Sequence, residues 1–241
     1  MKALIDADTV AFAPAASAEG QEEWVAIART KEMVERILLA VNATEYQLFL
    51  TGPNNFRYSI YPEYKASRVN AYRPTHEPAC RQYLLDEWGA VLVDGYEADD
   101  AVGIAQMEAA AKAASFDTTI ICHMDKDINM IPGWHYNWPL SREGKLIRDE
   151  IKYFVTYEEA FRNFCYQLLI GDPTDNIKGV VGIGPVKANA FLDTTPKEKW
   201  IEEIKNLYSC EEEFDLNARC LWICRSVPSE SSFLNDLDRS P

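Results

Sequence analysis

Gly95-Tyr96-Glu97-Ala98-Asp99-Asp100-Ala101-Val102 places three carboxylates within four residues. If this stretch opens a helix, small apolar residues spaced i, i+3, i+4 and i+7 form its buried face: Ala98, Ala101, Val102 and Ala105. The acids then lie at the N-terminus, where the helix dipole favours them, and that is the plain structural explanation. Clustered anions also raise one another's pKa unless a cation holds them together. The stretch therefore raises the question of whether other segments bring acids to the same place.

Other strands also end in acids. Residues 2–8 are predicted to form a short buried strand that ends in carboxylates, of which Asp6 is the first candidate ligand. Residues 118–122 are predicted to form another strand, followed by Asp125 and Asp127. A third strand, over 90–93, leads into Glu97. Each Asp-x-Asp alone is equally typical of a turn. Because parallel strands gather their carboxyl ends at one edge, the pattern predicts an α/β sheet with a carboxylate-lined crevice.

The remaining elements follow from periodicity and from breaks in it. Helical spacing predicts helices over 21–42, 77–88 and 157–170. A short strand is expected at 47–50, and residues 134–138 and 146–148 are expected to pair as two strands.

Composition limits the function. The chain has 241 residues, with 38 acids against 24 bases and a net charge of −14, which argues against a phosphate-binding surface. That argument weakens if eight acids form a metal site. The cysteines contain no CxxC pair and the histidines stand apart, so zinc is not expected. We find no secretory signal and no apolar run long enough for a bilayer, so we expect a cytoplasmic protein without a membrane partner.

A basic and aromatic segment interrupts the acidic chain. Cations and aromatic rings alternate along Arg57, Tyr58, Tyr61, Tyr64, Lys65, Arg68, Tyr72 and Arg73. Such a surface can neutralise phosphates and stack bases on tyrosine rings. The alternative is a solvated loop whose amphipathic side chains cover the core.

The last acids precede a glycine-rich turn. Asp172 and Asp175 follow Gly171, and Gly182-Ile183-Gly184-Pro185 then leads into a helix that carries Lys187. Such a turn exposes backbone amides that can approach a phosphate chain closely, although a plain turn is the usual explanation for Gly-x-Gly. The whole block resembles a helix-hairpin-helix.

Taken together and in this order, these motifs resemble the 5′ nuclease family, which includes bacteriophage 5′-3′ exonucleases and flap endonucleases and the 5′ nuclease domain of bacterial DNA polymerase I. The resemblance rests on residues 4–6, 62–68, 95–100, 125–127 and 171–184 and covers the chain to about residue 226. It implies a PIN-like core over 1–150 with a mostly parallel sheet flanked by helices, a helix-hairpin-helix region over 151–227, and a disordered tail over 228–241.

The resemblance also implies residue roles. Two divalent ions, Mg²⁺ or Mn²⁺, would be surrounded by Asp6, Glu97, Asp99, Asp100, Asp125, Asp127, Asp172 and Asp175. Asp6, Asp99 and Asp125 would be catalytic with Lys65 and Arg68, both of which would contact the scissile phosphate, and Tyr64 would stack on a base. Gly182, Gly184 and Lys187 would grip duplex DNA, with a potassium ion at the hairpin carbonyls as a further expectation.

The implied activity is metal-dependent hydrolysis of DNA phosphodiesters at 5′ ends, flaps or nicks during replication, giving 5′-phosphate products. The expected protein is a monomer, and RNA–DNA hybrids from primers remain open as substrates. The helical arch that threads single strands in larger members is expected to be short or incomplete, because only about thirty residues separate Tyr64 from Glu97. Asp8 is not counted as a ligand.

Three alternatives remain open. The pattern Asp6-Ala7-Asp8-Thr9 after an apolar strand also resembles the opening motif of dehalogenase-type phosphatases, in which the first Asp is a nucleophile. A PIN-type RNA nuclease shares the acidic crevice but lacks the hairpin. A module that binds forked DNA without cutting it would be expected to lose acids from the set.

Overall fold

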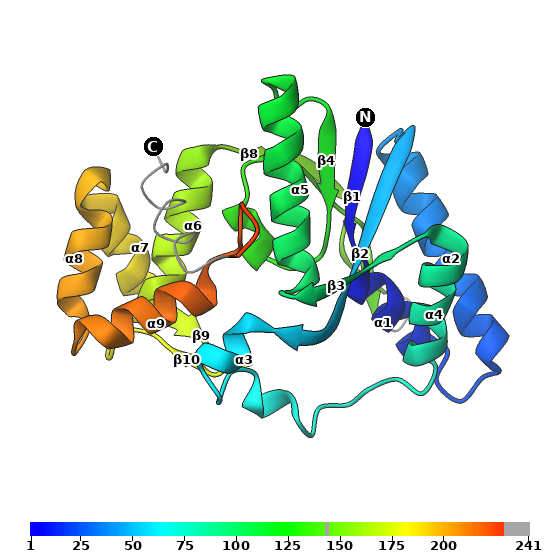
Figure 1. Cartoon of the computed structure of the whole chain (residues 1–241), viewed down its shortest axis with the longest axis horizontal. Helices are drawn as coiled ribbons and strands as arrows, with labels where there is room; N and C mark the ends of the chain where they lie inside the picture. The colour runs from blue at the N-terminus through cyan, green and yellow to red at the C-terminus, as the bar shows by residue number, and fades with distance from the viewer. Residues whose placement is uncertain (143–144, 229–241) are drawn as a thin grey trace.

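A six-stranded sheet lies at the centre of this computed structural model, which describes residues 1–142 and 145–228 (Figure 1). The strand order is β3-β2-β1-β4-β5-β8, and every pairing is parallel except that of β8 with β5. The strands span Lys2–Asp6 (β1), Glu45–Asn55 (β2), Val91–Gly95 (β3), Thr119–Cys122 (β4), Gly133–Asn137 (β5) and Ile151–Val155 (β8). The mostly parallel α/β sheet expected from the sequence is confirmed.

Helices cover both faces of the sheet because its central strand is apolar on both sides. Ala3 and Ile5 of β1 belong to a core that includes α1 (Ala7–Ser17), α2 (Glu23–Ala40) and α4 (Glu77–Trp88). Leu4 faces the other way, into a core with α5 (Ala98–Ala113) and α6 (Tyr157–Ile170). Side chains alternate along a strand, so one short strand is buried by two helical layers. No helix in the described residues is long and apolar enough to cross a membrane.

The C-terminal helices pack beside α6, away from α1, α2 and α4 (Figure 1). They are α7 (Pro185–Thr194), α8 (Trp200–Leu207) and α9 (Glu211–Leu221). Between α6 and α7 the chain doubles back through β9 (Gly171–Asp172) and β10 (Ile177–Lys178), which pair antiparallel. Here two glycines meet: a Cβ on Gly171, whose φ is +71°, would lie 2.3 Å from the Gly179 nitrogen. We call this close approach the glycine clasp.

A long connection, residues 61–76, links α3 (Phe56–Ile60) to α4 and is called the strap below (Figure 1). Its helical content is one 3-10 turn, Ala66–Arg68, so these described residues form no helical arch. This agrees with the expectation of a short or incomplete arch.

A buried ion pair ties the C-terminal segment to the start of α5. Arg57 is 1% exposed and donates to both carboxylate oxygens of Asp100, at 2.5 and 2.9 Å. Its guanidinium also donates to the carbonyls of Cys220 and Trp222, and Asp100 accepts from the Cys224 amide at 2.9 Å. Burial alone would raise the pKa of Asp100, but Arg57 holds it below its ordinary value. Arg57 is therefore a structural residue and not part of a phosphate-binding surface.

The helices predicted at 77–88 and 157–170 have those same bounds in the structure. The predicted pairing of 134–138 with 146–148 is wrong. β5 pairs with β8, whereas β7 (Lys145–Arg148) pairs with β6 (Leu140–Arg142) in a separate two-stranded sheet. The main sheet also extends to Val155, past the boundary expected at residue 150. The predicted tail lies outside the described residues from position 229 onward.

Replacing Asp100 with Asn should destabilise the protein by about 3–5 kcal/mol, because removing one charge of a buried pair leaves the other uncompensated. Urea unfolding followed by circular dichroism measures the change. Asp193→Asn, which breaks the more exposed pair with Arg162, is the matched control and should cost less than about 1 kcal/mol. Equal losses for the two variants would contradict the structural role of Asp100.

Candidate active site

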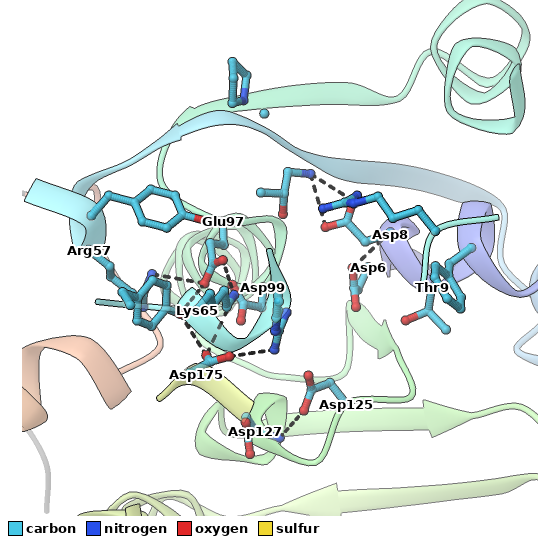
Figure 2. A pocket seen from close by; sticks show the side chains of 18 of the residues that line it. Asp6, Asp8, Thr9, Arg57, Lys65, Glu97, Asp99, Asp125, Asp127 and Asp175 are labelled. Atoms are coloured by element: carbon cyan, nitrogen blue, oxygen red, sulfur yellow. Dashed lines mark hydrogen bonds and ion pairs between the residues drawn. The ribbon is translucent and has the colours of Figure 1, made fainter. Parts of the chain in front are cut away.

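A pocket of about 1260 Å³ opens where β1, β3 and β4 end (Figure 2). Seven of the eight predicted metal ligands line it: Asp6, Glu97, Asp99, Asp125, Asp127, Asp172 and Asp175. They come from segments that are far apart in the sequence. The expectation that these strand ends meet at one edge of the sheet is therefore confirmed for these side chains.

Local backbone hydrogen bonds orient the acids. Asp6 is the N-cap of α1 and accepts from the Asp8 amide at 3.2 Å, while Glu97 is the N-cap of α5 within a reciprocal capping box. Asp125 accepts from the Asp127 amide at 2.8 Å, and Asp172 accepts from the Thr174 amide at 2.7 Å. Strand ends and helix starts thus fix the directions of the carboxylates, as capping side chains do generally.

Burial and mutual repulsion raise the pKa of several of these acids. The pKa of Asp6 rises to about 8 through burial, followed by the charges of Asp8 and Asp125. The pKa of Asp127 rises to about 7 through burial and then Asp125. Burial, Asp100 and Glu97 hold the pKa of Asp99 well above its ordinary value. Near neutral pH this pocket therefore binds protons, which is how a carboxylate cluster relieves repulsion when it lacks other cations.

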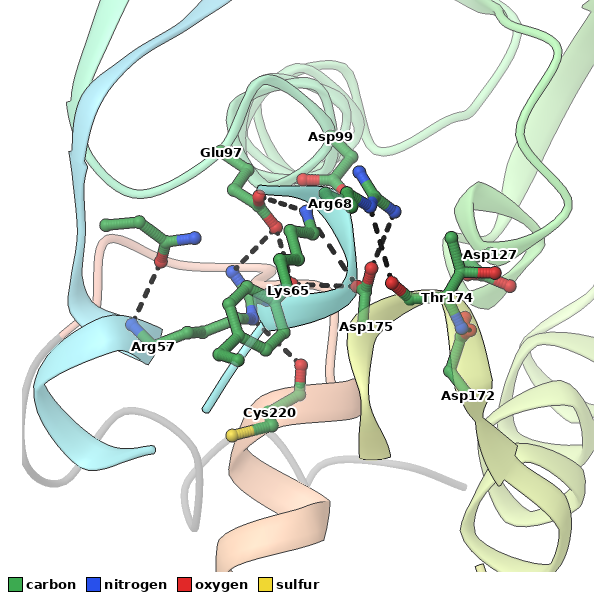
Figure 3. A network of polar contacts seen from close by, with 12 residues as sticks. Arg57, Lys65, Arg68, Glu97, Asp99, Asp127, Asp172, Thr174, Asp175 and Cys220 are labelled. Atoms are coloured by element: carbon green, nitrogen blue, oxygen red, sulfur yellow. Dashed lines mark hydrogen bonds and ion pairs between the residues drawn. The ribbon is translucent and has the colours of Figure 1, made fainter. Parts of the chain in front are cut away.

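The strap brings cations to the acids (Figure 3). Lys65 pairs with Glu97 and lies 3.8 Å from Asp175, while Arg68 contacts Asp175 at 2.6 Å. Lys65 has a left-handed backbone, φ +55°, and its amide donates to the Asp175 carbonyl at 3.0 Å. Burial would lower the pKa of the Lys65 ammonium, but Glu97 and Asp175 raise it. Lys65 and Arg68 therefore lie beside the acids, and their contact with a phosphate stays a prediction.

The pocket suits divalent ions by its chemistry more than by its present geometry. Carboxylate oxygens are the ligands that Mg²⁺ and Mn²⁺ prefer. However, in the part of the chain that the structure describes, no three acids are arranged as a ready site for one ion. Instead, Lys65 forms an ion pair with the carboxylate of Glu97, and Arg68 forms one with the carboxylate of Asp175. Binding of ions would require these ion pairs to rearrange.

The contacts of two predicted site residues differ from those expected for their roles. Asp100 does not line the pocket, because both of its oxygens are bound by Arg57, so its predicted metal role is corrected. Tyr64 lines the pocket but is only 3% exposed, and its hydroxyl donates to Glu97 and Asp175. Its ring is thus packed and not free to stack on a base, whereas Tyr58, in edge contact with it, is 47% exposed.

Sequence reasoning missed a further ion pair in the pocket, between Arg81 and Asp8. Arg81 of α4 donates to Asp8 at 2.6 Å, and Asp8 also accepts from the Thr51 amide at 3.2 Å. Both charged residues line the pocket. The repeated acid in Asp6-Ala7-Asp8 was the available signal for Asp8. No pattern in the sequence indicated Arg81.

The glycine hairpin lies at the exposed start of α7. The Lys187 ammonium donates to the Gly182 carbonyl at 2.8 Å, and the Ala188 amide donates to the Gly184 carbonyl at 2.9 Å. A potassium ion at these carbonyls would face the positive charge of Lys187. The arrangement therefore disfavours the potassium ion expected from the resemblance, while the exposed ammonium remains available to a phosphate.

Comparison with known proteins gives relatives in sequence, although no family model matches the chain. The chain is 30% identical over 170 residues to a 5′-3′ exonuclease of Buchnera aphidicola, covering 67% of this chain and 54% of that protein. It is 34% identical over 148 residues to the thermostable DNA polymerase I of Thermus thermophilus, covering 57% of this chain and 16% of the polymerase. The chain therefore spans about half of the exonuclease and a small part of the polymerase.

Solved structures share the fold. A bacteriophage T5 flap endonuclease in complex with DNA and metal ions matches with a TM-score of 0.64 at 17% identity, over 91% of this chain and 88% of that one. The bacteriophage T5 5′-exonuclease with bound zinc matches equally well, over 92% and 89%. Given the acidic pocket at the strand ends, the sequence relatives and this shared fold, the chain belongs to the 5′ nuclease family.

Proposed function

We propose that the chain is a divalent-metal-dependent nuclease that hydrolyses DNA phosphodiesters near 5′ ends, flaps and nicks, with Mg²⁺ or Mn²⁺ as the ions. One observation carries the proposal: seven carboxylates from four separate segments line one pocket. The raised pKa values of Asp6, Asp99 and Asp127 reflect burial and a shortage of positive charge there. The DNA and metal ions named with a T5 structure, and the exonuclease relatives, support it.

The acids divide into two ends of one pocket. Asp6 and Asp125 lie near each other at the ends of β1 and β4, and Glu97 and Asp175 lie beside the strap (Figure 2). Divalent ions held here would activate a water and stabilise charge on the attacking and leaving oxygens. The donors for them are the seven pocket acids, without Asp100.

Lys65 and Arg68 have a second role in this proposal. A phosphodiester is an anion, so it can replace Glu97 and Asp175 as partner of these cations when the carboxylates turn to the ions. The buried Lys65 ammonium, 14% exposed, then lies where negative charge develops in the transition state. Arg81, paired with Asp8 at the other end of the pocket, supplies a further positive charge toward the nucleic acid.

No histidine acts as the general base among the residues that line the pocket. His123, near Asp125 in sequence, is buried and contacts His135, and burial lowers its pKa to about 3. Its Nδ1 lies 2.6 Å from the Asp125 carbonyl, which positions the acid loop.

Asp99→Asn and Asp125→Asn should each abolish cleavage while leaving the circular dichroism spectrum unchanged, because each removes a charge that holds the ions and neither carboxylate anchors the core. Products of an end-labelled 5′-flap duplex, sized with Mg²⁺ or with chelator, measure the loss. Asp94→Asn, on β3 outside the pocket lining, is the matched control and should keep full activity. Near-normal turnover by either pocket variant would remove that acid from the site.

Without metal, stability should fall as pH rises from 5 to 8. The folded-state pKa values of Asp6 (about 8) and Asp127 (about 7) lie above the ordinary Asp value, so in this range the folded protein holds more protons than the unfolded chain. Two such groups should together give a slope of about 2 kcal/mol per pH unit over this range. Added Mn²⁺ should flatten it, because ions replace the protons. Urea unfolding across this pH range tests both, and a flat profile without metal is the contrary result.

Lys187→Ala should weaken binding to duplex DNA and reduce the slope of log affinity against log salt by about 1, because one phosphate contact is lost. Fluorescence anisotropy across a salt series measures both values. Lys31→Ala, on α2 and paired only at the surface with Glu35, is the control. An unchanged salt slope would place Lys187 outside the interface.

A further inference from the structure

A largely buried polar cluster packs against the acid loop, residues 123–127. Its members come from the loop, the turn after it and the strands β5 and β8: His123, Asn129, His135, Asn137 and Tyr153. The two histidines are 1% and 0% exposed, and no member of the cluster lines the pocket. Polar groups are costly to bury unless they are hydrogen-bonded, so the contacts of this cluster call for a reason.

Two histidine rings form a chain of contacts that ends at Asp125. His123 Nδ1 lies 2.6 Å from the Asp125 carbonyl oxygen, and His123 Nε2 lies 2.9 Å from His135 Nδ1. At the far end, His135 Nε2 lies 2.8 Å from the Ile131 carbonyl oxygen. The His135 ring also stacks on the Tyr153 ring, with centroids 5.4 Å apart. The chain thus joins the backbone of the acid loop to the core of the sheet.

These three contacts share too few hydrogens. Burial lowers the pKa of His123 to about 3 and that of His135 to about 4, so both rings are neutral at neutral pH. Two neutral imidazoles carry two N–H groups, and the carbonyl oxygens at the two ends of the chain only accept. One of the three contacts therefore lacks a hydrogen. The placement of the two hydrogens decides whether the Asp125 carbonyl is held.

Other hydrogen bonds of the cluster hold the flanks of the acid loop. The Asn137 side chain donates to the His123 carbonyl at 2.7 Å, before the acids. After them, the Tyr153 hydroxyl donates to the Asn129 side chain at 2.7 Å. The cluster reaches the middle of the loop, which carries Asp125, through the His123 ring.

The carbonyl and the carboxylate of Asp125 face different surroundings. The carbonyl meets a buried ring, whereas the carboxylate lines the pocket. Burial and then the charge of Asp125 raise the pKa of Asp127, so the two carboxylates of the loop repel each other. A hydrogen bond that holds the Asp125 carbonyl inward opposes the opening of the loop and keeps its carboxylates where an ion can meet both.

We propose that His123 is a positioning residue for divalent-ion binding, with its hydrogen on Nδ1 and donated to the Asp125 carbonyl. His135 fixes the ring of His123 from behind, and the contact left without a hydrogen is one of the two made by His135. This inference rests on the proposed nuclease function, because it concerns the ions of that site. His123 does not line the pocket, so it acts through Asp125.

Three substitutions at His123 separate the hydrogen bond from the bulk of the ring. His123→Asn places an amide N–H where Nδ1 lies and should keep the wild-type affinity for Mn²⁺. His123→Gln places its amide near Nε2, away from Asp125, and His123→Leu has no donor. Both should weaken Mn²⁺ binding about 10–100-fold, the usual effect of removing a group that orients a metal ligand. Calorimetric titration of the full chain with Mn²⁺, without nucleic acid, measures the affinity.

Thr119→Val is the matched control. Thr119 is buried at the opposite end of β4 from the acid loop, and its hydroxyl donates to Gln106 at 2.7 Å. The variant should lower the urea midpoint of unfolding, as His123→Leu does, yet leave Mn²⁺ affinity unchanged. Flap cleavage by His123→Leu should recover at high Mn²⁺ concentration, whereas Asp125→Asn should stay inactive.

The wild-type protein gives a direct readout of the hydrogen. In ¹⁵N-labelled protein, the nitrogen chemical shifts of His123 should show a protonated Nδ1 and an unprotonated Nε2. This measurement needs no variant, so it decides the matter even where a substitution prevents folding.

The outcomes separate the two proposals. Wild-type Mn²⁺ affinity in His123→Leu, a loss in His123→Asn as large as in His123→Leu, or a hydrogen on Nε2 instead of Nδ1 overturns the positioning role and leaves the nuclease intact. A wild-type chain that binds no Mn²⁺ and cuts no substrate overturns the nuclease proposal, and the positioning role with it.

Discussion

Electrostatic repulsion among buried carboxylates is the constraint around which this molecule is arranged. The sheet brings the acids that follow β1, β3 and β4 to one edge. Their negative charge is compensated in three ways. Protons bind at Asp6 and Asp127, whose pKa values are raised. Lys65 and Arg68 reach in from the strap. Arg57 binds both oxygens of Asp100, which does not line the pocket, and this pair fastens the C-terminal segment. Family membership and a nuclease site are both consistent with this arrangement.

The sequence predicted what depends on periodicity and on chain order. Helices α4 and α6 were predicted with their observed bounds from helical spacing, and in the structure Gly89 and Gly171 cap their C-terminal ends. The gathering of acids followed from a rule about parallel strands that needs no side-chain detail. Seven of eight predicted ligands line the pocket for this reason.

The errors came from features that sequence spacing does not encode. Asp99 and Asp100 are neighbours on α5, but successive helical residues point about 100° apart, so one enters the pocket and the other meets Arg57. Tyr64 looked like an exposed aromatic among cations, yet its hydroxyl is bound by two carboxylates. Spacing along the sequence could not tell whether β5 pairs with β7 or with β8. In the structure β5 pairs with β8, and β7 pairs with β6. The contact of Glu19 with Tyr72 joins residues 53 apart and has no local signature.

The glycine clasp links two surfaces that look separate. Gly171 and Gly179 approach so closely that any side chain at either position would force the paired backbones of β9 and β10 apart. Asp172 lies on one strand of this pair, and the exposed tip at Val181 and Gly182 continues from the other. A side chain at either glycine would therefore displace both the exposed tip and the Asp172 carboxylate of the pocket.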